Sequence, residues 1–170
     1  MRWSIALALL GCALQACADE SVLVRAAEVR GYGIFQPENM RPDGIGHTVT
    51  GVEFVDFTDK IPGRLGVDFG IKYVVDSKPK GETIDITNVI RFPGKGIPHL
   101  DGTFQKVLRE HNQVKLGFPD IYGYSFDKTR EILPGKWVFE VWVNRACVVR
   151  RTFTVVPDRE ADSLADNDNI

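Results

Sequence analysis

The chain has 170 residues, 44% of them hydrophobic and 26% charged, and its 21 Lys and Arg against 23 Asp and Glu give a formal net charge of −2. The hydrophobic fraction is too high for a disordered chain, and the balanced charge argues against a protein that binds nucleic acid electrostatically. Three cysteines are too few for a disulfide scaffold. A chain of this length is expected to form one domain with one hydrophobic core.

Residues 1–18 have the features of a secretory signal peptide. Arg2 supplies a positive charge, residues 5–10 form an apolar run, and small residues precede Asp19. The run is far shorter than the roughly 20 residues that cross a bilayer, so we predict a cleaved leader and no transmembrane helix in the mature chain. Two routes of processing remain open. Cleavage can leave Asp19 as the first residue, or Cys17 can be lipidated within a sequence that resembles a bacterial lipobox.

Alternation of apolar and polar residues predicts strands along the body of the chain. Strands are expected at residues 22–35, 51–57, 67–75, 82–92, 113–118 and 122–126. Gly31 and Gly33 within the first of these indicate a bulge or a close approach of two backbones. Residues 101–108 are expected to form one short helix, because their apolar side chains fall at helical spacing, although a strand fits almost as well.

The clearest alternation lies near the C-terminus, where a strand at residues 137–143, a turn at 144–146 and a return strand at 147–156 predict a hairpin. On the first strand, one face carries Trp137, Phe139, Val141 and Val143, and the other carries Val138, Glu140 and Trp142. On the return strand, Cys147 is expected to be a buried thiol in an inward row that contains one charged residue, Arg151.

Many short strands with little helix favour an all-β fold. We predict an immunoglobulin-like β-sandwich of about seven to nine strands with at most one short helix, formed by a single domain at residues 19–157. Residues 158–170 hold five Asp and Glu against one Arg and almost nothing to bury, which predicts an acidic disordered tail.

Several short motifs of the body occur together in a known family. They are GYGIF at residues 31–35, KIPGRLGVDFGI at 60–71, YSFD at 124–127 and EILPGKW at 131–137. In this combination the chain resembles domain-of-unknown-function family 3859, a family of secreted bacterial β-rich proteins, over residues 26–156. The resemblance implies a small β-rich domain of the cell envelope. The family name carries no activity, so the resemblance implies no catalytic residue.

The side chains that commonly carry catalysis show no recognisable pattern. His47, His99 and His111 lie far apart and lack the spacing of metal ligands on one helix. Period two places Glu53 and Asp56 on opposite faces of a strand, which argues against a glycosidase pair. We therefore predict no catalytic, metal-binding or cofactor-binding residues, and we favour a binding or structural protein over an enzyme.

Recognition residues are expected in a loop rich in Pro and Gly and among exposed aromatics. Loops on a rigid sandwich commonly carry binding, and aromatic side chains anchor protein partners or stack on sugars. The predicted recognition residues are Ile97, Pro98, His99, Leu100, Tyr122, Tyr124 and Trp142.

These features together predict an exported bacterial protein that is periplasmic, secreted, or anchored to the membrane through a lipidated Cys17. We expect a non-enzymatic binding or structural domain of the cell envelope, whose partner is an envelope protein or a glycan. The alternative is a periplasmic carbohydrate-binding protein or hydrolase that uses loop aromatics and carboxylates.

Overall fold

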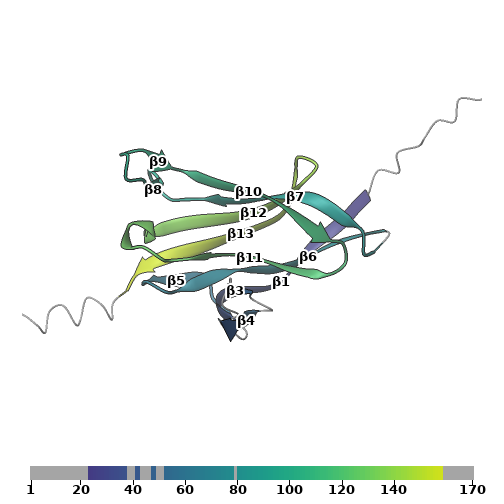
Figure 1. The fold of residues 1–170 in the computed structure, drawn as a ribbon, viewed down its shortest axis with the longest axis horizontal. Coiled ribbons are helices and arrows are strands. Elements are labelled where there is room, and N and C mark those ends of the chain that lie inside the picture. Colours follow the sequence, from purple (N-terminus) through teal and green to yellow (C-terminus); the bar gives the residue numbers. More distant parts are fainter. Residues whose placement is uncertain (1–22, 38–40, 43–46, 49–51, 79, 159–170) are drawn as a thin grey trace, which may run out of the picture.

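Two β-sheets packed face to face form the protein (Figure 1). The computed structural model describes residues 23–37, 41–42, 47–48, 52–78 and 80–158. The smaller sheet has the strand order β11–β6–β1–β4, with β1 (Leu23–Pro37), β4 (Val52–Asp56), β6 (Asp68–Lys78) and β11 (Pro119–Ser125). The larger sheet has the order β10–β7–β12–β13–β5, with β5 (Lys60–Gly63), β7 (Thr83–Arg91), β10 (Val107–Lys115), β12 (Gly135–Val143) and β13 (Ala146–Pro157). The predicted all-β sandwich is confirmed.

Neighbouring strands of the two sheets are antiparallel except for β5, which runs parallel to β13. Two short hairpins accompany the sheets, and they consist of β2 (Arg41–Pro42) with β3 (His47–Thr48) and β8 (Ile97–Pro98) with β9 (Phe104–Gln105). The described residues include no helix with the length and apolarity needed to cross a bilayer.

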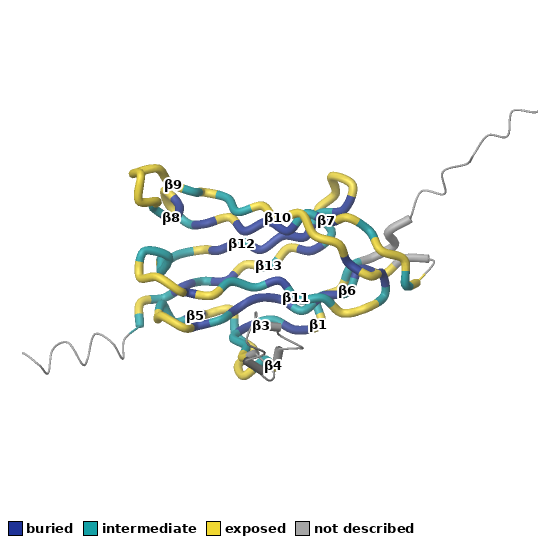
Figure 2. Tube along the Cα trace, viewed as in Figure 1, coloured by how far each residue is buried: buried dark blue, intermediate teal, exposed yellow. Residues whose placement is uncertain are grey.

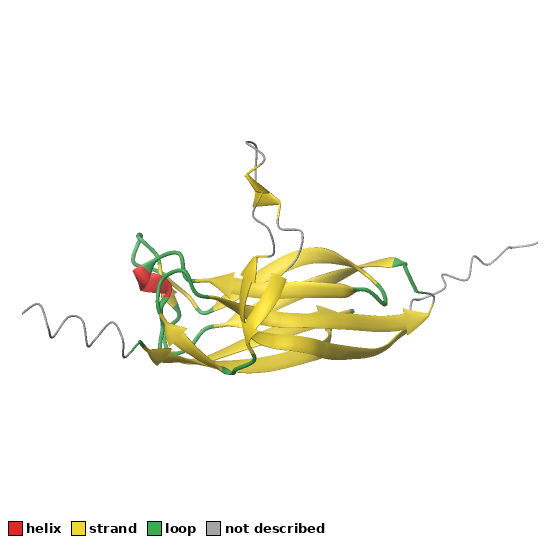
Figure 3. Cartoon of the chain, turned by 90° about the horizontal axis from the view of Figure 1, so that it is seen from below, coloured by secondary structure: helices red, strands yellow, loops and turns green. Residues whose placement is uncertain are grey.

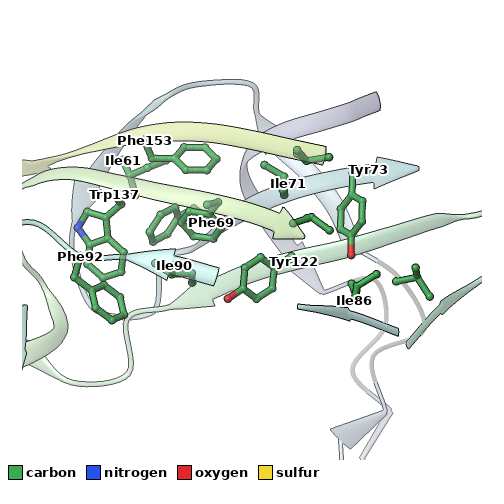
Figure 4. Packing of buried hydrophobic residues seen from close by; sticks show 14 of the residues in the cluster. Ile61, Phe69, Ile71, Tyr73, Ile86, Ile90, Phe92, Tyr122, Trp137 and Phe153 are labelled. Atoms are coloured by element: carbon green, nitrogen blue, oxygen red, sulfur yellow. The ribbon is translucent and has the colours of Figure 1, made fainter. Parts of the chain in front are cut away.

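The core lies between the sheets and contains a cluster of aromatic rings among Ile, Val and Leu side chains (Figure 4). Phe69 of β6 is fully buried, and its ring centre lies 5.2–5.7 Å from those of four rings. These rings belong to Phe126, Trp137, Phe139 and Phe153. The predicted inward face of β12 is therefore confirmed. Buried positions follow the strands of both sheets, whereas the turns at the two ends are mostly exposed (Figure 2).

A close approach of two backbones fixes β1 against the end of β4. A Cβ atom added at Gly33 would lie 2.0 Å from the carbonyl oxygen of Asp56, and Gly33 has a φ of 126°. The pairing of β1 shifts register between Val29 and Gly31 and again between Ile34 and Phe35. The bulge and close approach predicted from the two glycines are confirmed.

The helix predicted at residues 101–108 is wrong. Phe104 belongs to β9, whereas Val107 and Leu108 begin β10, which pairs with β7 along its whole length. The apolar residues of this segment belong to two strands and not to one helix. The turn between β8 and β9 is closed by the backbone N–H of His99, which donates to the carbonyl of Thr103 at 2.9 Å. A single turn of 3₁₀ helix, η1 (Thr129–Glu131), lies instead at this end of the sandwich, beside β8 (Figure 3).

The buried position predicted for Cys147 is also wrong, because its free thiol is exposed. The β12–β13 pairing shifts register after Val141, which places Cys147 opposite Trp142 on the outer face. The rest of the inward row is buried as predicted, with Val149, Phe153 and Val155 in the core. The charged member of that row, Arg151, stacks its guanidinium 3.4 Å from the centre of the Tyr32 ring.

Candidate functional site

A row of side chains crosses four strands on the outer face of the larger sheet. Arg109 of β10 is the register partner of Val89 of β7, which is in turn opposite Glu140 of β12, and Glu140 is opposite Arg150 of β13. Although both face outward, Val89 is only 3% exposed and Glu140 is 0% exposed. The longer side chains around these two residues therefore shield them from solvent.

Other hydrogen-bonding side chains occupy the positions next to this row along β7 and β10. The Oγ1 atom of Thr87 lies 3.2 Å from Nδ1 of His111, and Nε2 of Gln113 donates to Oδ1 of Asp85 at 2.9 Å. Trp142 extends the same layer onto β12, because it is the register partner of Thr87. The face thus combines charged, neutral polar and aromatic side chains.

These residues line an open concavity of about 1110 Å³ over β7, β10 and the β12–β13 turn. Its lining residues are Asp85, Ile86, Thr87, Val89, Arg91, Arg109, His111, Asn112, Gln113, Trp142, Asn144 and Arg145. Three arginines line it against one aspartate, so its charge is positive although the whole chain is slightly acidic.

The buried carboxylate of Glu140 holds two of the side chains that line this concavity. Its Oε2 atom accepts hydrogen bonds from Nε of Arg91 at 3.2 Å and from Nε1 of Trp142 at 2.9 Å. Its Oε1 atom accepts two more from Arg150, at 3.1 and 2.8 Å. Because charge-assisted bonds are short and directional, Glu140 fixes how Arg91 and Trp142 are presented.

The same bonds set the ionisation of Glu140. Burial alone would raise its pKa, but the hydrogen bonds from Arg91, Trp142 and Arg150 favour the carboxylate and hold the pKa below its ordinary value of 4.5. Glu140 is therefore an anion at neutral pH, and it offsets part of the positive charge around it.

We expect this lowered pKa to make the protein less stable in acid. A depressed pKa contributes stability above the pKa of the unfolded chain, and this contribution is lost as the pH falls through the folded pKa. Glu140→Gln should lower the free energy of unfolding by about 1–3 kcal/mol at neutral pH, and the difference from wild type should shrink between about pH 5 and pH 3. Urea denaturation across this range measures it, and a difference that stays constant with pH contradicts the assignment.

Arg109 and Arg145 differ from Arg91 and Arg150 in their partners. Arg91 and Arg150 form ion pairs with Glu140, with N–O distances of 3.2 and 2.8 Å. Within the part of the chain that the structure describes, no carboxylate forms an ion pair with Arg109 or Arg145. Their guanidinium groups are therefore open to an anion from outside.

Arg145 reaches the concavity from a strained turn. Asn144 and Arg145 connect β12 to β13 and have φ values of 47° and 68°, in the left-handed region. A two-residue hairpin turn of this kind favours Asn-Gly, because glycine adopts a positive φ without steric cost. The sequence matches this preference at Asn144, but it places an arginine where glycine fits best.

A family model described as Domain of unknown function (DUF3859) matches residues 23–155, most of the chain. The chain belongs to the DUF3859 family. Among solved structures, the DUF3859 chain is similar to an immunoglobulin-like protein of Pseudomonas aeruginosa, with 21% identity and a TM-score of 0.58. The match covers 82% of the DUF3859 chain and 99% of the other protein, and at this identity it bears on the fold alone.

A weaker match is to the alkylpurine DNA glycosylase AlkC of Pseudomonas fluorescens bound to DNA with an abasic site analogue. It has 18% identity and a TM-score of 0.37, and it covers 57% of the DUF3859 chain and 27% of the glycosylase. This score is too low to support any argument. No curated protein matches the chain.

The predicted recognition residues of the DUF3859 domain fall into three places. Ile97 and Tyr122 belong to the core, where burial raises the pKa of the Tyr122 hydroxyl, and the Tyr124 ring packs 5.1 Å from that of Trp137. The β8–β9 hairpin contains Pro98, His99 and Leu100; Leu100 is 93% exposed. Trp142 alone among them lines the large concavity.

The β8–β9 hairpin forms a smaller hollow at the end of the sandwich. His99 and Leu100 line it together with Arg130 of η1, and its volume is about 490 Å³. Within the described ranges, no three His, Cys, Asp or Glu side chains gather as metal ligands would. The side chain of His47, and Cys17 with the proposed leader, lie outside the described residues.

Sequence reasoning missed three arginines that line the concavity, Arg91, Arg109 and Arg145, and the buried Glu140 that holds Arg91 and Trp142. Two of them carry a signal that the sequence displays. Glu140 is the acidic residue in an otherwise apolar strand, and Arg145 follows Asn144 where a hairpin turn favours glycine. Arg91 and Arg109 carry no such signal, because only strand pairing brings them to the same face.

Proposed function

We propose that this DUF3859 protein is an exported, non-enzymatic binding domain of the bacterial cell envelope, and that it binds an anionic ligand on the concave outer face of β10, β7 and β12. The observation that carries the proposal is the pair Arg109 and Arg145, two cations that line one concavity without an ion-pair partner among the described residues. The guanidinium group offers two parallel N–H donors, which match a carboxylate or a phosphate.

The position of Arg145 supports a binding role. An arginine at a positive φ costs stability that glycine would not cost, and strained residues of this kind cluster at functional sites. The arginine is explained if its side chain serves the concavity that it lines.

Replacing Arg145 with glycine separates binding from folding. We expect Arg145→Gly to raise the free energy of unfolding by about 0.5–1 kcal/mol, because glycine relieves the turn. The same variant should weaken the binding of inorganic polyphosphate at low ionic strength by about ten-fold or more, because a charge-assisted contact is lost. Isothermal titration calorimetry measures the binding, and thermal or urea denaturation measures the stability.

Two further variants control this experiment. Arg109→Gln should weaken polyphosphate binding as Arg145→Gly does, whereas Lys72→Gln should leave it unchanged. Lys72 lies on β6 between Ile71 and Tyr73, which both face the core, so its side chain is on the outer face of the other sheet. Lys72→Gln therefore removes one positive charge away from the concavity. An equal effect of Lys72→Gln, or no binding of polyphosphate by the wild type, contradicts the proposed anion-binding face.

Export rests on the N-terminal sequence, namely Arg2, the apolar run 5–10 and the small residues before Asp19. The mass of the protein recovered from the bacteria that produce it tests this part. A chain that begins at Asp19 supports export as a free protein, and a lipid on Cys17 supports membrane anchoring. A chain that still begins at Met1 contradicts export.

A further inference from the structure

We infer that the concave face takes an acidic sugar unit of a glycan, with its carboxylate or phosphate bound by Arg109 and Arg145 and its ring against Trp142. The inference rests on the proposed anion-binding function and narrows the ligand to one chemical class. It is carried by the conjunction, in one concavity, of an aromatic side chain, a small apolar floor and two arginines that have no ion-pair partner among the described residues.

Trp142 supplies the surface for a sugar ring. Its indole is half-buried, lines the concavity, and is held by the 2.9 Å hydrogen bond from Nε1 to Glu140. An aromatic ring held in place in this way offers a large contact area at little cost in conformational entropy. Glu140 is thus a positioning residue, because it orients the indole and Arg91 without lining the concavity.

The spacing across the sheet suits one ligand unit between the aromatic ring and a cation. Trp142 and Arg109 lie two strands apart, on β12 and β10. Arg109 is level with Val89 of β7, and Trp142 is level with Thr87, the next outward-facing residue of β7. Neighbouring strands are about 4.8 Å apart and outward-facing residues on one strand about 6.7 Å apart, so the Cα atoms of Trp142 and Arg109 are roughly 12 Å apart. Both side chains line the concavity. Val89 forms the floor between them and is apolar.

Four hydrogen-bonding side chains that line the concavity suit the hydroxyl groups of a sugar. Thr87 and His111 share one hydrogen bond, and Asp85 and Gln113 share another. These four side chains include both hydrogen-bond donors and acceptors. They can therefore pair with sugar hydroxyl groups, which also donate and accept. A uronic acid or a sugar phosphate combines these hydroxyls with a charge and an apolar ring face.

An acidic peptide fits the concavity less well. A peptide that adds to a sheet gains its affinity from main-chain hydrogen bonds along an edge strand. The concavity opens on the face of the sheet over β7, which is paired on both sides by β10 and β12, whereas the free backbone groups of β10 lie along the edge of the sheet. Its floor offers side chains rather than free backbone groups, which favours a glycan.

The test compares four probes on the purified full-length protein. The probes are tetragalacturonate, mannose 6-phosphate, neutral maltotetraose and hexaglutamate. Nuclear magnetic resonance of the ¹⁵N-labelled protein follows the indole N–H of Trp142, assigned by its loss in Trp142→Phe, and calorimetry gives the affinities. We expect at least one acidic sugar to move this signal saturably and to bind about ten-fold or more tightly than maltotetraose and hexaglutamate.

Variants at the aromatic ring provide the second measurement. Trp142→Leu should weaken binding of the acidic sugar by about ten-fold, whereas Trp142→Phe, which keeps a ring, should retain most of it. Phe57→Leu is the matched control, because Phe57 is 66% exposed and lies outside the concavity. The methyl signals of each variant show that the fold is intact before binding is compared.

The outcomes separate this inference from the function on which it rests. If hexaglutamate binds as tightly as the acidic sugars and depends on Arg145, the anion-binding face stands and the glycan inference is overturned. If maltotetraose binds equally well, or Trp142→Leu binds as wild type does, the inference is overturned. If polyphosphate and all four probes fail to bind, the proposed function fails with it. Comparing the affinities for tetragalacturonate and mannose 6-phosphate shows whether the site prefers a carboxylate or a phosphate.

Discussion

Replacing Phe69 with alanine is expected to lower the free energy of unfolding by about 3–5 kcal/mol. Phe69 is fully buried, and its ring meets aromatic rings of both sheets, including Trp137 and Phe153 of the larger one. Its removal leaves a cavity in contact with all of these rings, and the packed sheets cannot collapse far enough to fill it. The shift of the urea midpoint at unchanged slope measures the loss.

Phe57→Ala is the control for this prediction. It removes the same ring from a position that is 66% exposed, so we expect a change within about 0.5 kcal/mol. If the two substitutions cost the same, the aromatic cluster around Phe69 does not hold the sheets together.

Gly33→Ala is expected to destabilise the protein by about 3 kcal/mol or more. An alanine Cβ would lie 2.0 Å from the carbonyl oxygen of Asp56 and 2.9 Å from the backbone nitrogen of Thr58, so β1 would have to move away from the chain after β4. The φ of 126° adds a conformational cost that an L-amino acid rarely meets. Denaturant unfolding of the variant, or its failure to accumulate as a folded protein, reports the effect.

Gly66→Ala separates the two causes. Gly66 also has a positive φ, 74°, but an added Cβ would meet nothing within 4 Å. It should therefore cost only about 1 kcal/mol, the conformational part alone. A similar loss in both variants would show that the close approach at Asp56 is unimportant.

The sequence was most informative where one strand face is fully buried. The alternation through Trp137 and Phe139 correctly predicts β12, because each inward residue meets the opposite sheet. The prediction failed for Cys147, since a single register shift after Val141 turned it outward, and such a shift leaves no trace in a period-two pattern. The sequence also gives no reason for a charged Arg151 in the inward row. The structure explains it, because the guanidinium of Arg151 stacks on the ring of Tyr32.

The concavity was largely beyond sequence reasoning. Arg91, Arg109 and Trp142 come from three strands, and their proximity depends on which strands are neighbours and in which register. The sequence predicts an outward-facing Trp142 because it alternates with the Trp137 face, which is a local property. Pairing of β7 with both β10 and β12 is a property of the whole fold, so the cations that surround Trp142 could not be foreseen.

The parallel pairing of β5 with β13 has a consequence for when the protein can fold. Thr154 is opposite Lys60, and among the strands that the structure describes β5 pairs with β13 alone. During synthesis, which proceeds from the N-terminus, β5 emerges long before the strand that it needs, and such non-local pairing is slow to form. The larger sheet is therefore incomplete until nearly the entire chain has been made. The export that we propose needs a chain that is still unfolded when it reaches the secretion pore, and late closure of the larger sheet would keep it so.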